Sequence, residues 1–83
     1  MNDGLPVTPA QWDALELVVA RADGQAPTYV VHHEPEGDAA IMATQAEALA
    51  RRGLVTVADG SCWPTDAGRR ALARQRRIEG RTS

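Results

Sequence analysis

The chain of 83 residues contains no phenylalanine and no lysine, and Cys62 is its one cysteine. A single cysteine excludes an internal disulfide bond. No apolar run approaches the roughly 20 residues of a membrane-spanning helix, and the acidic N-terminus lacks the cationic start of a signal peptide. We therefore expect one small domain in the reducing cytoplasm, without contact to a membrane.

The charge of the chain is divided between its two halves. Residues 1–48 carry eight acidic side chains and one arginine, whereas residues 49–83 carry eight arginines and three acidic side chains. The sum is a net charge of −2. Arginine is the side chain best suited to bidentate contacts with phosphate. The second half therefore favours an anionic partner, and the first half favours a basic one.

The first helix has a strong start signal at residues 8–11. Thr8 is a good N-cap, Pro9 suits the first helical position, and Gln11 completes a capping box. Apolar residues then recur at spacings of three and four as far as Ala22, which predicts an amphipathic helix that ends at Gly24. Residues 28–33 favour a short strand, and residues 34–37 favour a turn.

The region 38–65 predicts a helix followed by a hairpin. Asp38 as N-cap and Gly53 just past the C-terminus predict a helix over residues 38–52. Residues 54–57 and 61–63 then read as two strands joined by Asp59-Gly60. A type I′ turn needs φ > 0 at both central positions, which this dipeptide supplies.

A last helix is predicted over residues 66–79, capped by Thr65, with residues 1–6 and 80–83 flexible. Gly68 lies inside this helix, where it costs about 1 kcal/mol relative to alanine. We interpret this glycine as a site where another element packs closely. The large apolar residues expected in the core are Trp12, Leu15, Val18, Val19, Tyr29, Val31, Ile41, Met42, Leu49, Leu54, Val57, Trp63 and Leu72.

Part of this region resembles a known family. Residues 48–55 read ALARRGLV, Asp59-Gly60 follows, and residues 65–69 read TDAGR. This run resembles winged helix-turn-helix regulators of MarR-like and PadR-like type, over the second half of the chain only. The resemblance implies a single winged-helix domain over residues 1–83. Its fold would be α+β, with three helices and a two- or three-stranded antiparallel sheet.

The chain departs from that family before the recognition helix. A winged helix has a complete second helix there. This sequence leaves no room for one, because Asp38, the predicted cap of the next helix, follows directly after the turn that ends at Gly37. The second helix is either lost or replaced by an irregular segment within residues 28–37.

The first functional hypothesis is a small DNA-binding transcriptional regulator, for example of a phage or other mobile element, that acts as a homodimer. The helix at 38–52 would read double-stranded DNA, and the hairpin would be the wing. The predicted DNA-binding residues are Thr44, Gln45, Arg51, Arg52, Ser61, Arg69 and Arg70. The structural alternative is that Arg51 and Arg52 stabilise a helix C-terminus, where the helix dipole favours cations. Glu47 and Asp59 also oppose DNA binding.

The second hypothesis is a protein-interaction module, since winged helices also dock proteins. Its acidic surface would bind a basic host protein, and the residues that would form it are Asp13, Glu16, Glu34, Glu36 and Asp38.

Catalysis, a cofactor and a metal are not expected. His32 and His33 are adjacent, so on a strand they point to opposite faces and cannot easily bind one ion. No cysteine or histidine spacing suits zinc. Cys62 has no neighbouring histidine that could act as a base, so we interpret it as a small buried residue.

Overall fold

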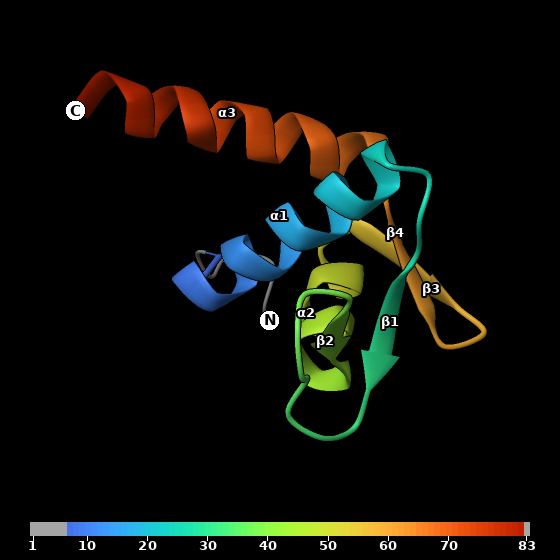
Figure 1. Ribbon diagram of the computed structural model, residues 1–83. Helices are drawn as coiled ribbons and strands as arrows, with labels where there is room; N and C mark the ends of the chain where they lie inside the picture. The colour runs from blue at the N-terminus through green and yellow to red at the C-terminus, as the bar shows by residue number, and fades with distance from the viewer. Residues whose placement is uncertain (1–6, 83) are drawn as a thin grey trace.

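The computed structural model describes the backbone of residues 7–82 and the side chains of residues 7–78. The helices are α1 (Pro9–Asp23), α2 (Ala43–Arg51) and α3 (Asp66–Thr82), and the strands are β1 (Thr28–Val31), β2 (Ala40–Met42), β3 (Val55–Ala58) and β4 (Ser61–Pro64). Their order along the chain is α1-β1-β2-α2-β3-β4-α3 (Figure 1). The expected α+β class with three helices is confirmed.

The two ends of the chain differ from one another. The predicted flexibility of residues 1–6 concerns a segment outside the described residues. At the other end, α3 continues to Thr82, three residues beyond the predicted end at residue 79, and the predicted flexibility of residues 80–83 stays a prediction. No helix within residues 7–82 is both long enough and apolar enough to span a bilayer.

Helix α1 begins as its sequence predicts. The backbone N–H of Gln11 donates to Thr8 Oγ1, and the Thr8 N–H donates to Gln11 Oε1, each over 3.2 Å. Pro9 takes the first helical position, and Gly24 follows the last turn. These bonds satisfy donors that the first turn of a helix otherwise leaves unpaired, so the start of α1 is locally determined.

The four strands form one mixed sheet in the order β2-β1-β4-β3. Strand β4 is antiparallel to both β1 and β3, whereas β1 and β2 are parallel, with Val30 opposite Ile41. The prediction of a purely antiparallel sheet of two or three strands is therefore wrong in strand number and in one pairing. The return from β1 to β2 is made by a loop of residues 32–39 (Figure 1).

Strand β2 replaces the first part of the predicted helix over 38–52. Helix α2 begins only at Ala43, Met42 is its N-cap without a side-chain hydrogen bond, and Asp38 does not cap it. Residues 40–42 are extended instead because they pair with β1, which buries Ile41 to 5% exposure. Strand β2 therefore precedes α2 directly, and no helix lies between α1 and α2 in the described part of the chain.

The structure of the hairpin confirms the type I′ turn predicted at Asp59-Gly60. Asp59 and Gly60 have φ values of +53° and +74°, as a type I′ turn requires. In the antiparallel ladder Val57 lies opposite Cys62 and Thr56 opposite Trp63. The closed end of the hairpin extends away from the helices (Figure 1). Val57 is 43% exposed for this reason, although it shares a sheet face with the buried Cys62.

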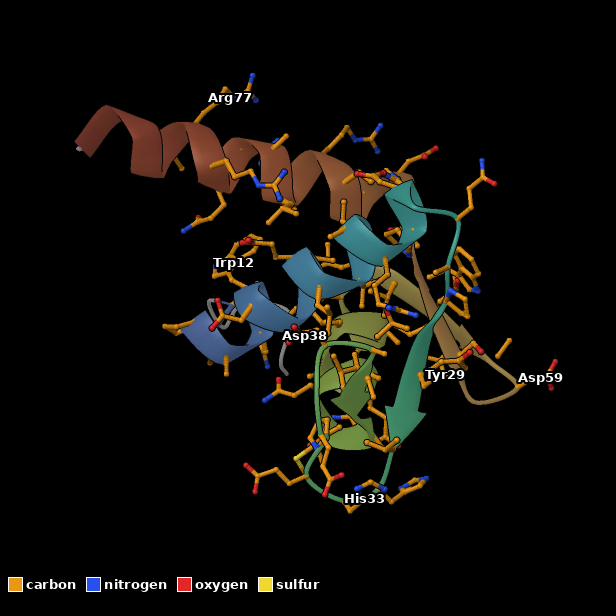
Figure 2. All side chains as sticks on the ribbon, viewed as in Figure 1. Trp12, Tyr29, His33, Asp38, Asp59 and Arg77 are labelled. Atoms are coloured by element: carbon orange, nitrogen blue, oxygen red, sulfur yellow. The ribbon has the colours of Figure 1, made fainter. Side chains whose placement is uncertain are left out.

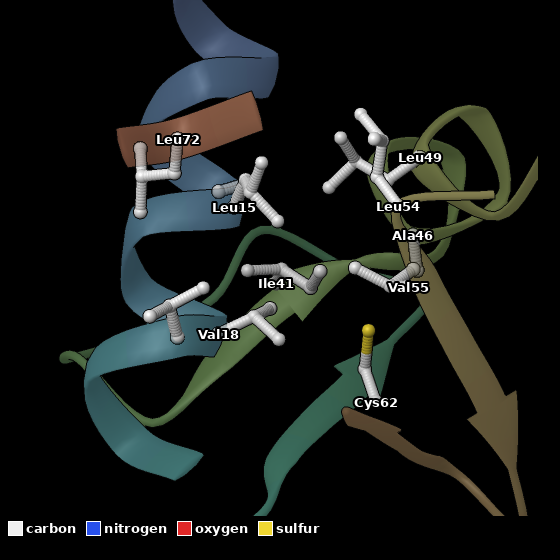
Figure 3. Close-up of a cluster of buried hydrophobic side chains, with 11 residues drawn as sticks. Leu15, Val18, Ile41, Ala46, Leu49, Leu54, Val55, Cys62 and Leu72 are labelled. Carbon is white, nitrogen blue, oxygen red and sulfur yellow. The ribbon is translucent and has the colours of Figure 1, made fainter. Parts of the chain in front are cut away.

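The core lies between the three helices and one face of the sheet (Figure 3). It contains Leu15, Val18, Ile41, Ala46, Leu49, Leu54, Val55, Cys62 and Leu72. Tyr29 and Trp63 were also expected there, but they are 50% and 39% exposed. Successive side chains of a strand point to opposite faces. Thr28 and Cys62 face the core, so Tyr29 and Trp63 face outward.

Four residues join α3 to the end of α2. The Thr65 hydroxyl donates to Gly53 O over 2.6 Å, and the Thr65 N–H donates to Leu54 O over 3.1 Å. The same hydroxyl accepts the N–H of Gly68 over 3.0 Å, which confirms Thr65 as the cap of α3. A Cβ atom on Gly68 would overlap the carbonyl group of Leu54. Gly68 therefore allows the close packing that the sequence predicts.

Replacement of Gly68 tests this contact. The Gly68→Ala substitution removes a helix-propensity cost of about 1 kcal/mol, yet it forces a methyl group into the backbone of Leu54. We expect the free energy of unfolding to fall by about 2 kcal/mol or more, measured by urea denaturation. The exposed Ala73 on the same helix provides the control, since Ala73→Gly should cost only about 1 kcal/mol. A Gly68→Ala protein as stable as the parent would contradict the close packing.

Candidate nucleic-acid interface

Helix α2 buries one face and exposes the other. Ala43, Ala46 and Leu49 are buried. Thr44, Glu47 and Arg51 are exposed and recur at spacings of three and four, so they share the solvent face. Gln45 is half-buried at the edge of this face. Of the predicted DNA-binding residues on α2, Thr44 and Arg51 are thus accessible, and an acidic side chain lies between them.

The C-terminal end of α2 carries two consecutive arginines. Arg51 is the last helical residue and is exposed, whereas Arg52 is the C-cap and is half-buried. Cations near a helix C-terminus are stabilised by about 0.3–1 kcal/mol through the helix dipole. This stabilisation explains in part why two arginines lie at this helix end. Arg51 is nevertheless exposed to solvent.

The hairpin presents an acidic tip. Asp59 lies at the end of the turn (Figure 2). Ser61, predicted as a wing contact, is half-buried within β4, opposite Tyr29. Its side chain therefore lies on the outward face of the sheet together with that of Tyr29.

The arginines of α3 lie mainly on its outer face. Gly68 and Leu72 face the core, so Arg70, Arg74 and Arg77, spaced by four and three residues, form a stripe on the opposite side of the helix. Arg77 points away from the rest of the protein (Figure 2). Helix α1 lies between α3 and α2 (Figure 1). The structure therefore separates this stripe, which includes the predicted Arg70, from the exposed face of α2.

Arg69 has a different role from its neighbours on α3. Its Nη1 donates to Asp23 Oδ1 at the end of α1 over 2.7 Å. Both side chains are well exposed, so this ion pair contributes little, of the order of 0.5 kcal/mol. The pair nevertheless directs Arg69 toward α1 instead of toward the predicted DNA-binding residues of α2.

A second charged surface lies along α1. Residues Asp13, Glu16, Leu17 and Ala20 of α1 and Asp38 of the β1–β2 loop line an open groove of about 420 Å³. Asp38 lies beside α1 (Figure 2). The structure thus brings three of the predicted acidic residues together, and Glu34 and Glu36 remain exposed in the same loop.

The sequence reasoning missed the apolar part of this groove. Asp13, Glu16, Leu17 and Ala20 follow the spacing i, i+3, i+4 and i+7, which places four residues on one helix face. The periodicity that identifies the core side of α1 could therefore have shown this face as well. The position of Asp38 could not have been found, because it depends on the β1–β2 pairing.

The histidines and Cys62 are the remaining candidates for metal binding or catalysis. Nδ1 of His33 lies 3.0 Å from the backbone oxygen of Glu34. Within the described part of the chain, no group of three histidine, cysteine, aspartate or glutamate side chains could hold a metal ion. Cys62 is 1% exposed, and burial raises the pKa of its thiol to about 11. A buried thiol with a raised pKa is a poor nucleophile.

Comparison of the chain with protein-family models, with curated proteins and with solved structures gave no match. The resemblance to winged helix-turn-helix regulators therefore stays a prediction.

The pKa of Cys62 predicts a loss of stability at alkaline pH. The folded state keeps the thiol proton at pH values where the unfolded chain has released it. The free energy of unfolding should thus fall between about pH 9 and pH 11, by at most about 2–3 kcal/mol. Urea denaturation over this pH range measures the fall. The Cys62→Ala protein is the control, because it retains every other titrating group. Parallel profiles for the two proteins would contradict the prediction.

Proposed function

We propose that the protein binds double-stranded DNA as a winged helix that lacks the second helix of the motif. Helix α2 would enter the groove, and the β3–β4 hairpin would be the wing. The observation that supports this proposal is the solvent-exposed face of α2, followed at once by a hairpin that extends beyond the core. A small cytoplasmic transcriptional regulator, for example of a phage or other mobile element, fits such an interface.

Phosphate contacts would supply most of the affinity. Arg51 at the end of α2 is the best placed residue, with Arg52 beside it, and Thr44 would contact the DNA from the first turn of the same helix. Contacts with phosphate release counterions and make binding depend on salt. Glu47 and Asp59 would face the same phosphates and repel them. We therefore propose weak binding that a small number of arginines dominate.

The salt dependence of binding tests this proposal. With two phosphates neutralised by Arg51 and Arg52, the slope of log K against log salt concentration should be about −2. Anisotropy of a labelled random-sequence duplex at increasing salt measures it. The double substitution Arg51→Ala and Arg52→Ala removes both charges, so the slope should fall to about zero.

The double substitution Arg74→Ala and Arg77→Ala is the matched control, because it removes two charges from the outer face of α3. It should leave both the affinity and the slope unchanged. The proposal fails if the duplex does not bind at low salt. It also fails if the control weakens binding as much as the substitution of Arg51 and Arg52, since α3 would then be the contact.

A second function is favoured by the acidic groove along α1. There, Asp13, Glu16 and Asp38 surround two small apolar contacts, Leu17 and Ala20. This arrangement suits a basic amphipathic helix, whose arginines would pair with the carboxylates while its apolar side chains contact Leu17. Docking of a basic host protein is therefore the alternative to DNA binding.

A synthetic peptide with the sequence of residues 66–82 is a suitable basic helix for testing the alternative. If the groove docks such a helix, the double substitution Asp13→Asn and Glu16→Gln should weaken peptide binding about ten-fold, measured by calorimetry. The substitutions Glu47→Gln and Asp59→Asn change the net charge equally but lie outside the groove. Equal losses from both pairs would show a non-specific charge effect instead of docking.

A further inference from the structure

Strand β3 forms an open edge of the sheet. In the strand order β2-β1-β4-β3 it has a neighbouring strand on one side only within the described part of the chain. The edge strands of natural sheets present unpaired N–H and C=O groups, and charged side chains, proline or bulges usually protect them from pairing with another chain. Strand β3 reads Val-Thr-Val-Ala and pairs with β4 without a bulge. It therefore carries none of these three protective features itself.

We propose that β3 pairs with β3 of a second copy of this chain, antiparallel and about a two-fold axis at Thr56. The axis would be perpendicular to the sheet, so the two four-stranded sheets would form one continuous sheet with both sets of helices on the same side. This pairing does not depend on DNA binding, because the backbone of β3 supplies most of it.

The hydrogen bonds of β4 show which of its backbone groups face β3. The backbone oxygen of Gly60 accepts from the N–H of Val30 over 2.9 Å, so Gly60 directs its backbone groups toward β1. In an antiparallel ladder the N–H and C=O groups of successive residues point to alternate sides of the strand. Ser61 and Trp63 therefore direct their backbone groups toward β3.

The same alternation identifies the backbone groups at the open edge. Thr56 lies opposite Trp63, so its N–H and C=O groups bond within the hairpin. Its neighbours Val55 and Val57 direct their groups to the other side, which is the open edge. Pro64, which has no N–H to donate, lies opposite Val55, as expected for a pair without hydrogen bonds between its members.

A two-fold axis at Thr56 satisfies these edge groups. Val55 then lies opposite Val57 of the second copy, and Val57 lies opposite its Val55, so each pair exchanges both N–H···O bonds. Thr56 lies opposite Thr56 of the second copy in a non-hydrogen-bonded pair, where side chains come closest, and threonine pairs stabilise such positions. The contacts are reciprocal, as an interface with two-fold symmetry requires.

The pairing also covers an exposed apolar side chain. Val57 is 43% exposed because the closed end of the hairpin extends away from the helices (Figure 1), although it shares a sheet face with the buried Cys62. In the paired sheet it would lie beside Val55 of the second copy, which is 3% exposed at the margin of its own core. Val57 would thus extend the core of the second copy, and burial of its apolar surface would favour association.

Charge complementarity supports a second copy as the occupant of this edge. Gly53 and Asp59 are equally far from Thr56, so the axis places Gly53 opposite Asp59 of the second copy. Arg51 and Arg52 immediately precede Gly53 at the end of α2. The acidic tip of each hairpin would therefore approach the basic helix end of the other copy, where opposite charges attract and fix the register.

The neighbouring register is less favourable. With the axis at Val57, Asp59 would lie opposite Val55 of the second copy, which is 3% exposed. A carboxylate would then lie beside apolar side chains, and its desolvation would oppose the pairing. Charge and burial thus favour the same axis at Thr56.

Sedimentation equilibrium of the full chain, without DNA, tests the pairing. We expect a monomer–dimer equilibrium at protein concentrations between about 10 μM and 1 mM, as suits a small interface. Thr56→Lys places two ammonium groups directly opposite one another, so it should raise the dissociation constant at least about ten-fold. Thr44→Lys is the matched control, because it adds the same charge on the exposed face of α2. It should leave the dissociation constant unchanged.

A disulfide bond across the axis tests the register. The Cα atoms of a non-hydrogen-bonded antiparallel pair lie about 4.5 Å apart, a distance that a disulfide spans. Thr56→Cys should therefore form a covalent dimer under mild oxidation. Ala58→Cys, at an exposed position on the same face of β3, should not, because the two copies of residue 58 would lie more than about 13 Å apart. The parent chain, whose Cys62 is buried, provides the blank.

Three results would overturn the proposal. The first is a chain that stays monomeric at every concentration. The second is a dimer that a folded Thr56→Lys protein still forms with the affinity of the Thr44→Lys protein, because the interface would then lie elsewhere. The third is equal cross-linking of the Thr56→Cys and Ala58→Cys proteins. Circular dichroism verifies that each variant is folded, and the cross-linking decides the question if Thr56→Lys does not fold.

Discussion

The contact between Gly68 and the backbone of Leu54 is the constraint on which the arrangement of this protein depends. It places the first turn of α3 against the connection between α2 and β3, and Thr65 bonds to Gly53 and Leu54 of that connection. Any side chain at position 68 would separate these elements. The end of α2, the base of the hairpin and the start of α3 are therefore held as one unit.

This unit gives a physical meaning to the resemblance with winged helix-turn-helix regulators. Gly53, Leu54, Thr65 and Gly68 all belong to the run that carries the resemblance, and all four join α2, β3 and α3. They hold α2 and the β3–β4 hairpin in fixed positions relative to one another, and this structural role involves no contact with a partner. These four residues of the run therefore maintain an arrangement of elements, whereas the proposed function depends on other side chains, Arg51 and Arg52 in the same run and Thr44 outside it.

Helix α1 separates the charged surfaces of the molecule. Asp13 and Glu16 line the groove on one flank, whereas Trp12, Arg51 and Arg52 line a groove on the α3 side. The stripe of Arg70, Arg74 and Arg77 faces away from the core. The acidic and basic halves of the sequence thus form distinct surfaces, and the exposed ion pair Arg69–Asp23 links α3 to the end of α1. Each surface can consequently recognise a partner of opposite charge.

The sequence by itself determined the features that depend on near neighbours. The capping box of Thr8 and Gln11, the turn at Asp59-Gly60 and the cap at Thr65 are bonds or backbone angles within three residues, and local chemistry specifies them. Only the tertiary structure decided that residues 40–42 form a strand, because Ala-Ile-Met suits a helix equally well until Val30 pairs with Ile41. The same holds for the outward position of Trp63 and for the separation of the arginine stripe from α2, since both depend on which face of an element the remaining chain covers.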